Sequence, residues 1–426
     1  MPIPRWALPL LLILAASNAQ PAGSAVERFQ NLRNKVRLAR SSKDWHANVE
    51  SAHELAEFLN ESPGSLLELA RAEVHAGDLK GAVRHVQQFV SMGQYSELLE
   101  TSDEFTPLRN AASSLQIQKE MKENLSTTSL ASTAFRLSDS SLLAEDIDYD
   151  PHGKRFFLTS VREKKIVSVD ATGAIHDFTK SPDNWPMLAI KIDSARGVVW
   201  VTEVALKGFV FAPEADWGKS AVLRYDRKSG KLLSRIDGPR GSALGDMSLA
   251  ANGDAIVSDG EGGGIYRVAA NGDQLERLDA GDFVSPQTPA MHPDGKHVFV
   301  PDYVRCIGLL DIASKQVRWL STQGRFAMDG IDGLYFDHGK LIAVQNGSSP
   351  ERVVMFTLDD TLSRITGETI IEKATDTLGD PTHGVVVGND FYYIADSGWD
   401  VIDEHGSLKA GAKQSEPRIM KFEIKR

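Results

Sequence analysis

The chain has 426 residues and is acidic, with 58 Asp and Glu against 47 Lys and Arg and a formal net charge of −11. This charge argues against a nucleic-acid backbone or an anionic membrane surface as a partner, and it suits a cation or a neutral small molecule. The single cysteine, Cys306, excludes an intrachain disulfide, so burial of apolar surface must hold the fold together.

The first predicted element is a secretory signal at residues 1–19. Arg5 gives a basic start, Trp6 to Ala16 form an apolar core, and Ser17-Asn18-Ala19 is a small-residue cleavage site. This core is too short to cross a bilayer as a helix, and no later stretch of the sequence approaches the roughly 20 apolar residues that a span requires. We therefore expect an exported protein, periplasmic or secreted, without a membrane span.

Residues 25–125 are predicted to form an all-α domain, because apolar residues recur at helical spacing and helix-forming residues dominate. One amphipathic stripe runs from Trp45 to Leu59 and ends at Ser62-Pro63-Gly64. A second stripe runs from Leu66 to Gly77, and a third helix starts after Asp78.

Small residues lie where the second and third of these helices meet, at Ala70, Gly77 and Ala82. This pattern resembles a tetratricopeptide repeat, in which small residues let two antiparallel helices pack closely. The match covers little more than one repeat, so we expect the helices to lean on the next domain. A groove that binds a protein partner is the alternative.

Residues 126–141 are rich in Ser and Thr and are predicted to be a linker. From residue 142, short β-branched and aromatic runs alternate with Asp, Pro and Gly turns, as in an all-β domain. Six units repeat, with turns at positions 153, 197, 253, 295, 339 and 389. Their spacing is that of four-stranded blades, so residues 142–426 are predicted to form a six-bladed β-propeller.

A propeller places the first strand of each blade around a central tunnel, so the residues that start these strands meet at one mouth. Glu145, Asp246, Gln287 and Asp332 offer oxygen donors there from four blades. Three carboxylates and an amide in a narrow tunnel call for a counter-ion, and such oxygen ligands are typical of calcium. The alternative is that each residue caps a turn through its own backbone.

His383, in the turn Asp380-Pro381-Thr382-His383-Gly384, is a candidate general base beside such a metal, because an imidazole transfers protons near neutral pH. A structural histidine is the alternative. Glu203 and Asp302, which end second strands, are weaker candidates. The sequence contains no nucleophile-elbow Gly-x-Ser-x-Gly, no zinc-type His-Glu-x-x-His and no phosphate-binding glycine loop.

Two blade signatures, Ala290 to Asp302 (AMHPDGKHVFVPD) and Gly330 to Phe336 (GIDGLYF), resemble those of the gluconolactonase, senescence-marker and paraoxonase superfamily of six-bladed propellers. The resemblance covers roughly residues 135–426. It implies a calcium ion at the tunnel mouth that polarises the carbonyl oxygen of a lactone or ester for hydrolysis.

Carried over by motif, the family's first-blade Glu matches Glu145 and the aspartate of its Asp-Gly pair matches Asp332. The Asn of the fourth blade is replaced by Gln287, and the Asn that precedes Asp246 is replaced by Gly245, which has no side-chain ligand. The second blade offers only Met187 and Leu188 at the mouth.

Two functions follow from these patterns. The first is a calcium-assisted hydrolase of lactones or esters, in which Glu145, Gln287 and Asp332 hold the metal, Asp246 orients and His383 is the candidate base. The second is a non-catalytic exported protein, in which the helical domain and the propeller bind a ligand or a protein partner.

Overall fold

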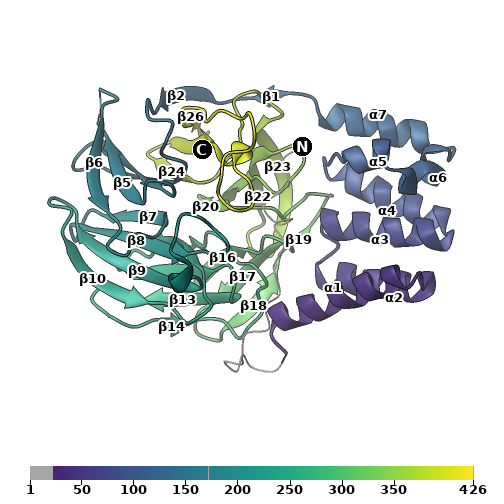
Figure 1. The fold of residues 1–426 in the computed structure, drawn as a ribbon, viewed down its shortest axis with the longest axis horizontal. Helices are drawn as coiled ribbons and strands as arrows, with labels where there is room; N and C mark the ends of the chain where they lie inside the picture. Colours follow the sequence, from purple (N-terminus) through teal and green to yellow (C-terminus); the bar gives the residue numbers. More distant parts are fainter. Residues whose placement is uncertain (1–22, 171, 426) are drawn as a thin grey trace.

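A computed structural model describes residues 23–170 and 172–425 of the chain. Within these ranges the N-terminal part is helical and the rest forms a six-bladed β-propeller, so the predicted fold class is confirmed (Figure 1). The predicted signal segment, residues 1–19, lies outside the described residues. No helix of the described ranges is long and apolar enough to cross a bilayer.

The helices begin and end where the sequence supplies capping residues. Ser24, Asp44 and Asp78 each accept a hydrogen bond from a backbone N–H of the helix that follows. Gly77 ends its helix in the left-handed conformation, with a φ of 82°. The resemblance to a tetratricopeptide repeat stays a prediction. The α helices are α1 (Ala25–Ser41), α2 (Trp45–Phe58), α3 (Pro63–Ala76), α4 (Leu79–Ser91), α5 (Glu97–Thr101), α6 (Thr106–Arg109) and α7 (Ser114–Asn124).

The propeller consists of six sheets, each with a core of four antiparallel strands, and β19 (Ser321–Thr322) adds to the fifth sheet by pairing parallel with β23. The inner strands contact one another in a closed ring around the tunnel, in the order β3, β7, β11, β15, β20, β24 and back to β3. The strands of each blade follow, from the inner strand outward. Blade one is β3 (Ala144–Asp150), β4 (Arg155–Ser160), β5 (Lys165–Val169) and β6 (Ile175–Lys180), and blade two is β7 (Met187–Asp193), β8 (Val198–Ala205), β9 (Lys219–Asp226) and β10 (Leu232–Asp237). Blade three is β11 (Leu244–Leu249), β12 (Ala255–Asp259), β13 (Gly264–Val268) and β14 (Glu276–Arg277), and blade four is β15 (Ala290–Met291), β16 (His297–Pro301), β17 (Ile307–Asp311) and β18 (Gln316–Trp319). Blade five is β20 (Gly333–Asp337), β21 (Lys340–Gln345), β22 (Arg352–Leu358) and β23 (Arg364–Lys373), and blade six is β24 (Gly384–Val387), β25 (Asp390–Asp396), β26 (Arg418–Glu423) and β2 (Ser132–Arg136).

The ring is closed by a strand from the segment that we predict to be a linker. β2 pairs antiparallel with β26 as the outer strand of the last blade, and β1 (Thr128–Ser129) pairs with β23. Most of residues 128–136 therefore belong to the sheets, and the linker is shorter than predicted. The prediction failed there because an outer strand is largely exposed, so its Ser-rich and Thr-rich composition is that of a loop.

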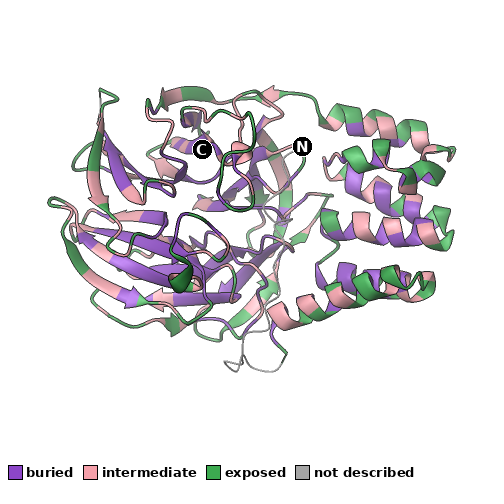
Figure 2. Cartoon of the chain, in the orientation of Figure 1, coloured by how far each residue is buried: buried purple, intermediate pink, exposed green. Residues whose placement is uncertain are grey.

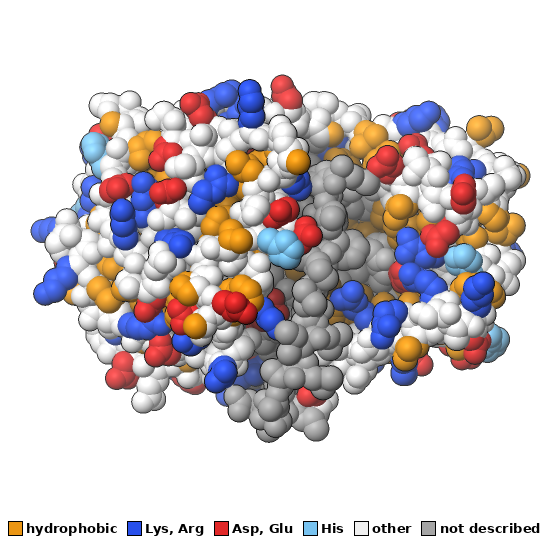
Figure 3. Space-filling model, viewed as in Figure 1, with side chains coloured by type: hydrophobic (Ala, Val, Ile, Leu, Met, Phe, Trp, Pro, Cys, Tyr) orange, Lys and Arg blue, Asp and Glu red, His pale blue; other side chains and the backbone are white. Residues whose placement is uncertain are grey.

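Burial is greatest in the middle strands of the blades and least in the outer strands. The second strands, such as β4 and β12, are mostly buried, whereas the outer strands β6 and β10 are mostly half-buried or exposed (Figure 2). On the face drawn in Figure 3, cationic and anionic side chains are interspersed, so the net negative charge is not gathered into one patch there. Cys306 is buried, and burial raises the pKa of its thiol far above the usual range.

The helices stack beside the propeller and contact loops on the face where the inner strands begin (Figure 1). The Ala25 N–H donates to the Gly281 carbonyl at 2.9 Å, and the Tyr95 N–H donates to the Ser349 carbonyl at 2.6 Å. Val284, which precedes an inner strand, packs in the core of α1 to α3. The helical domain therefore lies on the tunnel-mouth face of the propeller.

Arg305 of the propeller holds the helical domain at this interface. Its guanidinium lies 4.6 Å from the ring centre of Phe58 in α2 and 3.9 Å from that of Trp319. It also donates to the Asn60 Oδ1 and to the Asp282 carbonyl, both at 3.1 Å. We expect Arg305→Ala to weaken helix docking by about 2 kcal/mol, since the cation–π contact with Phe58 contributes about 0.5–2 kcal/mol and the hydrogen bond to Asn60 is lost as well.

Hydrogen exchange of the α1 and α2 amides measures this effect, and Arg305→Ala should speed exchange there and leave the propeller amides unchanged. Arg318→Ala is the matched control, because Arg318 lies in the same blade, is exposed and makes a single hydrogen bond to Thr361. Equal exchange in Arg305→Ala and Arg318→Ala would mean that other contacts dock the helices.

Candidate metal centre at the tunnel mouth

Three inner strands carry a β-bulge at the residues that face the mouth. The strand register shifts between Ala144 and Ile147 in β3, and equivalent shifts occur in β7 and β11. The shift in β3 contains Glu145 and Asp146, and the shift in β11 contains Asp246. A bulge interrupts the regular alternation of side chains along a strand, so the side chains at these positions can turn toward the mouth.

Blades five and six place one residue each directly before the inner strand. Asp332 precedes Gly333, and His383 precedes Gly384. A Cβ at Gly384 would lie 2.5 Å from the Tyr392 carbonyl oxygen, and a Cβ at Gly333 would lie 3.1 Å from the Thr382 carbonyl oxygen. Glycine is therefore required at position 384, because only the missing side chain permits this approach, whereas a side chain at position 333 would need its neighbours to shift slightly.

Three of the predicted site residues converge. One ligand atom each of Glu145, Asp332 and His383 lies within 4.8 Å of the others, and all three residues are buried. They come from blades one, five and six, so only closure of the ring brings them together. This trio is the candidate metal centre.

His383 makes a hydrogen bond with each ring nitrogen. Its Nδ1 lies 2.8 Å from the Glu145 carbonyl oxygen, and its Nε2 lies 3.1 Å from the Asp246 Oδ1. Burial alone would lower the pKa of His383, but the carboxylates of Asp246 and Asp332 outweigh it and raise the pKa to about 10. The imidazole is thus a cation at neutral pH that donates from both nitrogens.

This state differs from the prediction for His383. A general base needs a ring nitrogen with an open lone pair, and here both nitrogens face acceptors. The sequence identifies the histidine but not the carboxylates around it, which come from other blades. Asp246 contacts the His383 ring, and its role as the orienting group stays a prediction.

Asp146 ties the first blade to the second at the mouth. Its Oδ2 accepts hydrogen bonds from the Ile190 N–H at 2.8 Å and from the Lys191 Nζ at 2.5 Å. Asp146 is fully buried, and the Lys191 side chain is 12% exposed. The aspartate thus satisfies an inner-strand N–H that has no neighbouring strand to pair with.

Several positioning residues escaped the sequence analysis. The Trp399 Nε1 donates to the Glu145 Oε2 at 2.5 Å. The Asn346 Nδ2 donates to the Asp332 Oδ2 at 2.8 Å, and the Tyr303 hydroxyl donates to the Asn346 Oδ1 at 2.9 Å. The sequence offered a signal for Asn346, because this residue follows the second strand of its blade as Asp302 does. The sequence offered no signal for Trp399, because this residue lies in a long loop.

The predicted ligand Gln287 points elsewhere. Its amide nitrogen donates to the Ser285 carbonyl and hydroxyl oxygens, both at 3.3 Å, so a role as metal ligand stays a prediction. The carbonyl groups of Leu188 and Gly245, at the other two mouth positions, accept hydrogen bonds from Thr159 and Thr202. These two hydroxyls join neighbouring blades.

The donor set fits a hard divalent cation. Glu145 and Asp332 supply carboxylate oxygens, the ligand type that calcium takes. The mouth cluster of Glu145, Asp146, Asp246, Asp332, Lys191 and His383 contains four carboxylates and two cations, so a dication would offset its negative charge. Two protein carboxylates fill only part of a calcium coordination shell, which leaves positions for water and a substrate oxygen.

Asp302 caps a loop. It is fully buried, and its carboxylate accepts the N–H groups of Val284, Ser285 and Val304. Asp302 thus holds the segment that leads into β15.

Glu203 lies in a buried ionic cluster in the second blade. Its Oε2 accepts from the Ser181 hydroxyl at 2.7 Å, and Arg235 bridges it to Asp183. Burial raises the pKa of Glu203, and the neighbouring Asp183 raises it further. The folded protein therefore retains a proton that the unfolded chain releases, so stability falls as pH rises from the ordinary range of glutamate through the raised pKa.

We expect Glu203→Gln to flatten this fall, because glutamine does not titrate. Urea unfolding at intervals from pH 5 to 8 measures how the free energy of unfolding changes with pH. One titrating proton changes it by at most about 1.4 kcal/mol per pH unit. Glu276→Gln, in the exposed outer strand β14, is the control and should keep the wild-type slope. An unchanged slope in Glu203→Gln would assign the pH dependence to another group.

No protein-family model matches the chain, and no curated protein matches it in sequence. By structure it is similar to a gluconolactonase from Xanthomonas campestris, with 13% identity, 68% of this chain and 88% of that chain covered, and a TM-score of 0.46. It is also similar to regucalcin, a calcium-binding protein from Agrobacterium tumefaciens, with 14% identity, 70% and 96% covered, and a TM-score of 0.48.

A virginiamycin B lyase from Staphylococcus aureus is similar to the same degree, with 14% identity, 69% and 99% covered, and a TM-score of 0.45. The named activities of these three proteins differ. At such identities the likeness extends to the propeller fold alone, so function must be argued from the site.

Proposed function

We propose that the tunnel mouth binds a calcium ion through Glu145 and Asp332 and that the protein is an exported, calcium-dependent hydrolase of lactones or esters. The observation that carries this proposal is the convergence of Glu145, Asp332 and His383 from three blades, all buried and within 4.8 Å of one another. The resemblance of the Asp332-Gly333 motif and of Glu145 to the gluconolactonase group supports the choice of reaction.

Bound calcium would supply Lewis-acid polarisation of the substrate carbonyl. The chain's own residues prepare the site for that chemistry. Trp399 and Asn346 each hold one oxygen of a ligand carboxylate, which fixes the direction of Glu145 and Asp332. His383 keeps a positive charge beside the place where negative charge develops on the carbonyl oxygen, and Asp246 fixes its ring.

Hydrolysis of a panel of lactones and aryl esters, with calcium and with a chelator, tests the reaction. Wild type should turn over at least one substrate class only with calcium. Glu145→Gln should lose the activity, and Asp337→Asn should keep it, because Asp337 is a buried aspartate at the opposite end of the strand that follows Asp332. Activity that persists in chelator or in Glu145→Gln would exclude this mechanism.

A further inference from the structure

A second cluster of metal-ligand side chains lies far from the mouth. It belongs to the hairpin that joins β15 to β16, with the sequence His292-Pro293-Asp294-Gly295-Lys296-His297. Because inner strands begin at the mouth, this hairpin lies on the opposite face of the propeller. Backbone hydrogen bonds from the His292 N–H to the His297 carbonyl and from the Gly295 N–H to the His292 carbonyl fix its shape.

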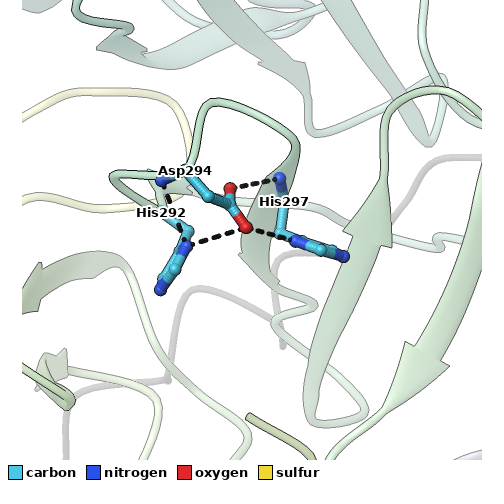
Figure 4. Close-up of side chains that lie close together, drawn as sticks. All are labelled: His292, Asp294 and His297. Carbon is cyan, nitrogen blue, oxygen red and sulfur yellow. Dashed lines mark hydrogen bonds and ion pairs between the residues drawn. The ribbon is translucent and has the colours of Figure 1, made fainter. Parts of the chain in front are cut away.

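Three ligand atoms of this hairpin point toward one another (Figure 4). The Asp294 Oδ2 lies 3.1 Å from the His292 Nδ1 and 2.6 Å from the His297 Nδ1. The other oxygen, Oδ1, accepts the N–H groups of Lys296 and His297, so the carboxylate cannot rotate away. All three side chains are partly exposed, between 20% and 32%, so an ion can reach them from solvent.

Each ring has one further contact. The Asp294 N–H donates to the His292 Nδ1 at 3.3 Å, so this nitrogen carries a lone pair, and a bound ion would replace the backbone contact. The His297 Nε2 lies 3.5 Å from the Asp311 Oδ2, on the side of the ring away from the cluster. A carboxylate behind the far nitrogen of a histidine is the usual support of a metal ligand.

We propose that His292, Asp294 and His297 bind a divalent transition-metal ion of the zinc and copper class. Two imidazole nitrogens and one carboxylate oxygen suit these ions, whereas calcium and magnesium take oxygen ligands. In the metal-free chain a proton on the His297 Nδ1 makes the short contact with Asp294, and the metal takes the place of that proton. Three protein ligands leave open positions for water or a further ligand.

This site is independent of the proposed calcium centre. The hairpin shares none of its residues with the mouth, and its nitrogen donors select a different class of ion. The ring of His292 also packs against Phe336 of the neighbouring blade, with ring centres 4.9 Å apart. A bound ion would therefore fix the hairpin of blade four against blade five.

Titration of the full-length mature protein with Cu²⁺, followed by electron paramagnetic resonance, tests the proposal. Wild type should bind one copper ion with splitting from two nitrogen ligands. His292→Ala and His297→Ala should each weaken binding on the order of 100-fold, at the upper end of the 10–100-fold typical of a lost supporting contact. Far-UV circular dichroism checks that these surface variants fold.

His338→Ala is the matched control. His338 lies in the equivalent hairpin of blade five, and its Nδ1 is 2.8 Å from the Asp337 Oδ1. Among the described residues, His338 belongs to no group of three metal-ligand side chains. The His338→Ala variant should bind copper as wild type does, and so should the Asp332→Asn variant. Wild-type binding in His297→Ala, or loss of the signal in Asp332→Asn, would overturn the site.

Discussion

We expect calcium to raise the unfolding temperature of the wild-type protein and to raise that of Asp332→Asn much less. A ligand that binds only the folded state stabilises it, by about 2.7 kcal/mol at a concentration one hundred times its dissociation constant. Asparagine keeps the shape of the side chain and an amide oxygen, but it removes the negative charge that strengthens calcium binding. Calorimetry of the mature protein with calcium and with a chelator measures the shift, which should be a few degrees in wild type.

The control for this prediction lies in the adjoining strand. Asp337→Asn removes a buried aspartate at the far end of β20 and should keep the full calcium shift. Comparing each variant with wild type in chelator separates the effect on the metal-free fold from the effect on binding. If Asp332→Asn gains as much as wild type, the ion does not bind at the mouth, and the hydrolase proposal loses its basis.

The largest loss of stability is expected for Asp146→Ala. This substitution leaves the Lys191 ammonium, 12% exposed, without its carboxylate and removes the acceptor of the Ile190 N–H. Breaking a buried ion pair by removing one partner costs about 3–5 kcal/mol, because the remaining charge stays desolvated. Urea unfolding in chelator measures the change in the free energy of unfolding without any contribution from a bound metal.

Two further variants show whether burial is the reason. Glu54→Ala breaks the pair with Lys35, in which both side chains are exposed, 59% for Lys35 and 53% for Glu54, and should cost less than about 1 kcal/mol. The double variant Asp146→Ala with Lys191→Met should recover much of the lost stability, since no charge is then left buried. A cost for Asp146→Ala no larger than that for Glu54→Ala would contradict this account.

Much of the architecture followed from local pattern. The six repeats of an alternating strand, a turn and two further strands predicted the number of blades and most strand positions, because each blade is built from residues close in sequence. The linker was the exception. β2 completes the last blade with β26, although Thr133 and its partner Met420 are far apart in the chain. Composition carries no information about such a pairing.

The candidate site was predictable as a set of positions. Repeat position fixes location around the tunnel, so Glu145, Asp332 and His383 could be named from the sequence as residues that start inner strands. The direction of each side chain was not fixed in this way. Gln287 occupies the equivalent position, but its amide nitrogen donates to Ser285.

The sequence by itself determined the fold class, the repeat and the residues available at the mouth, because these depend on local periodicity and on position within a blade. Only the tertiary structure decided the chemistry of that mouth. His383 is a cation because carboxylates from other blades surround it, and Trp399 and Asn346 reach the ligands from distant loops. Electrostatic energy and hydrogen bonding depend on distances between residues far apart in sequence, and those distances exist only once the ring has closed.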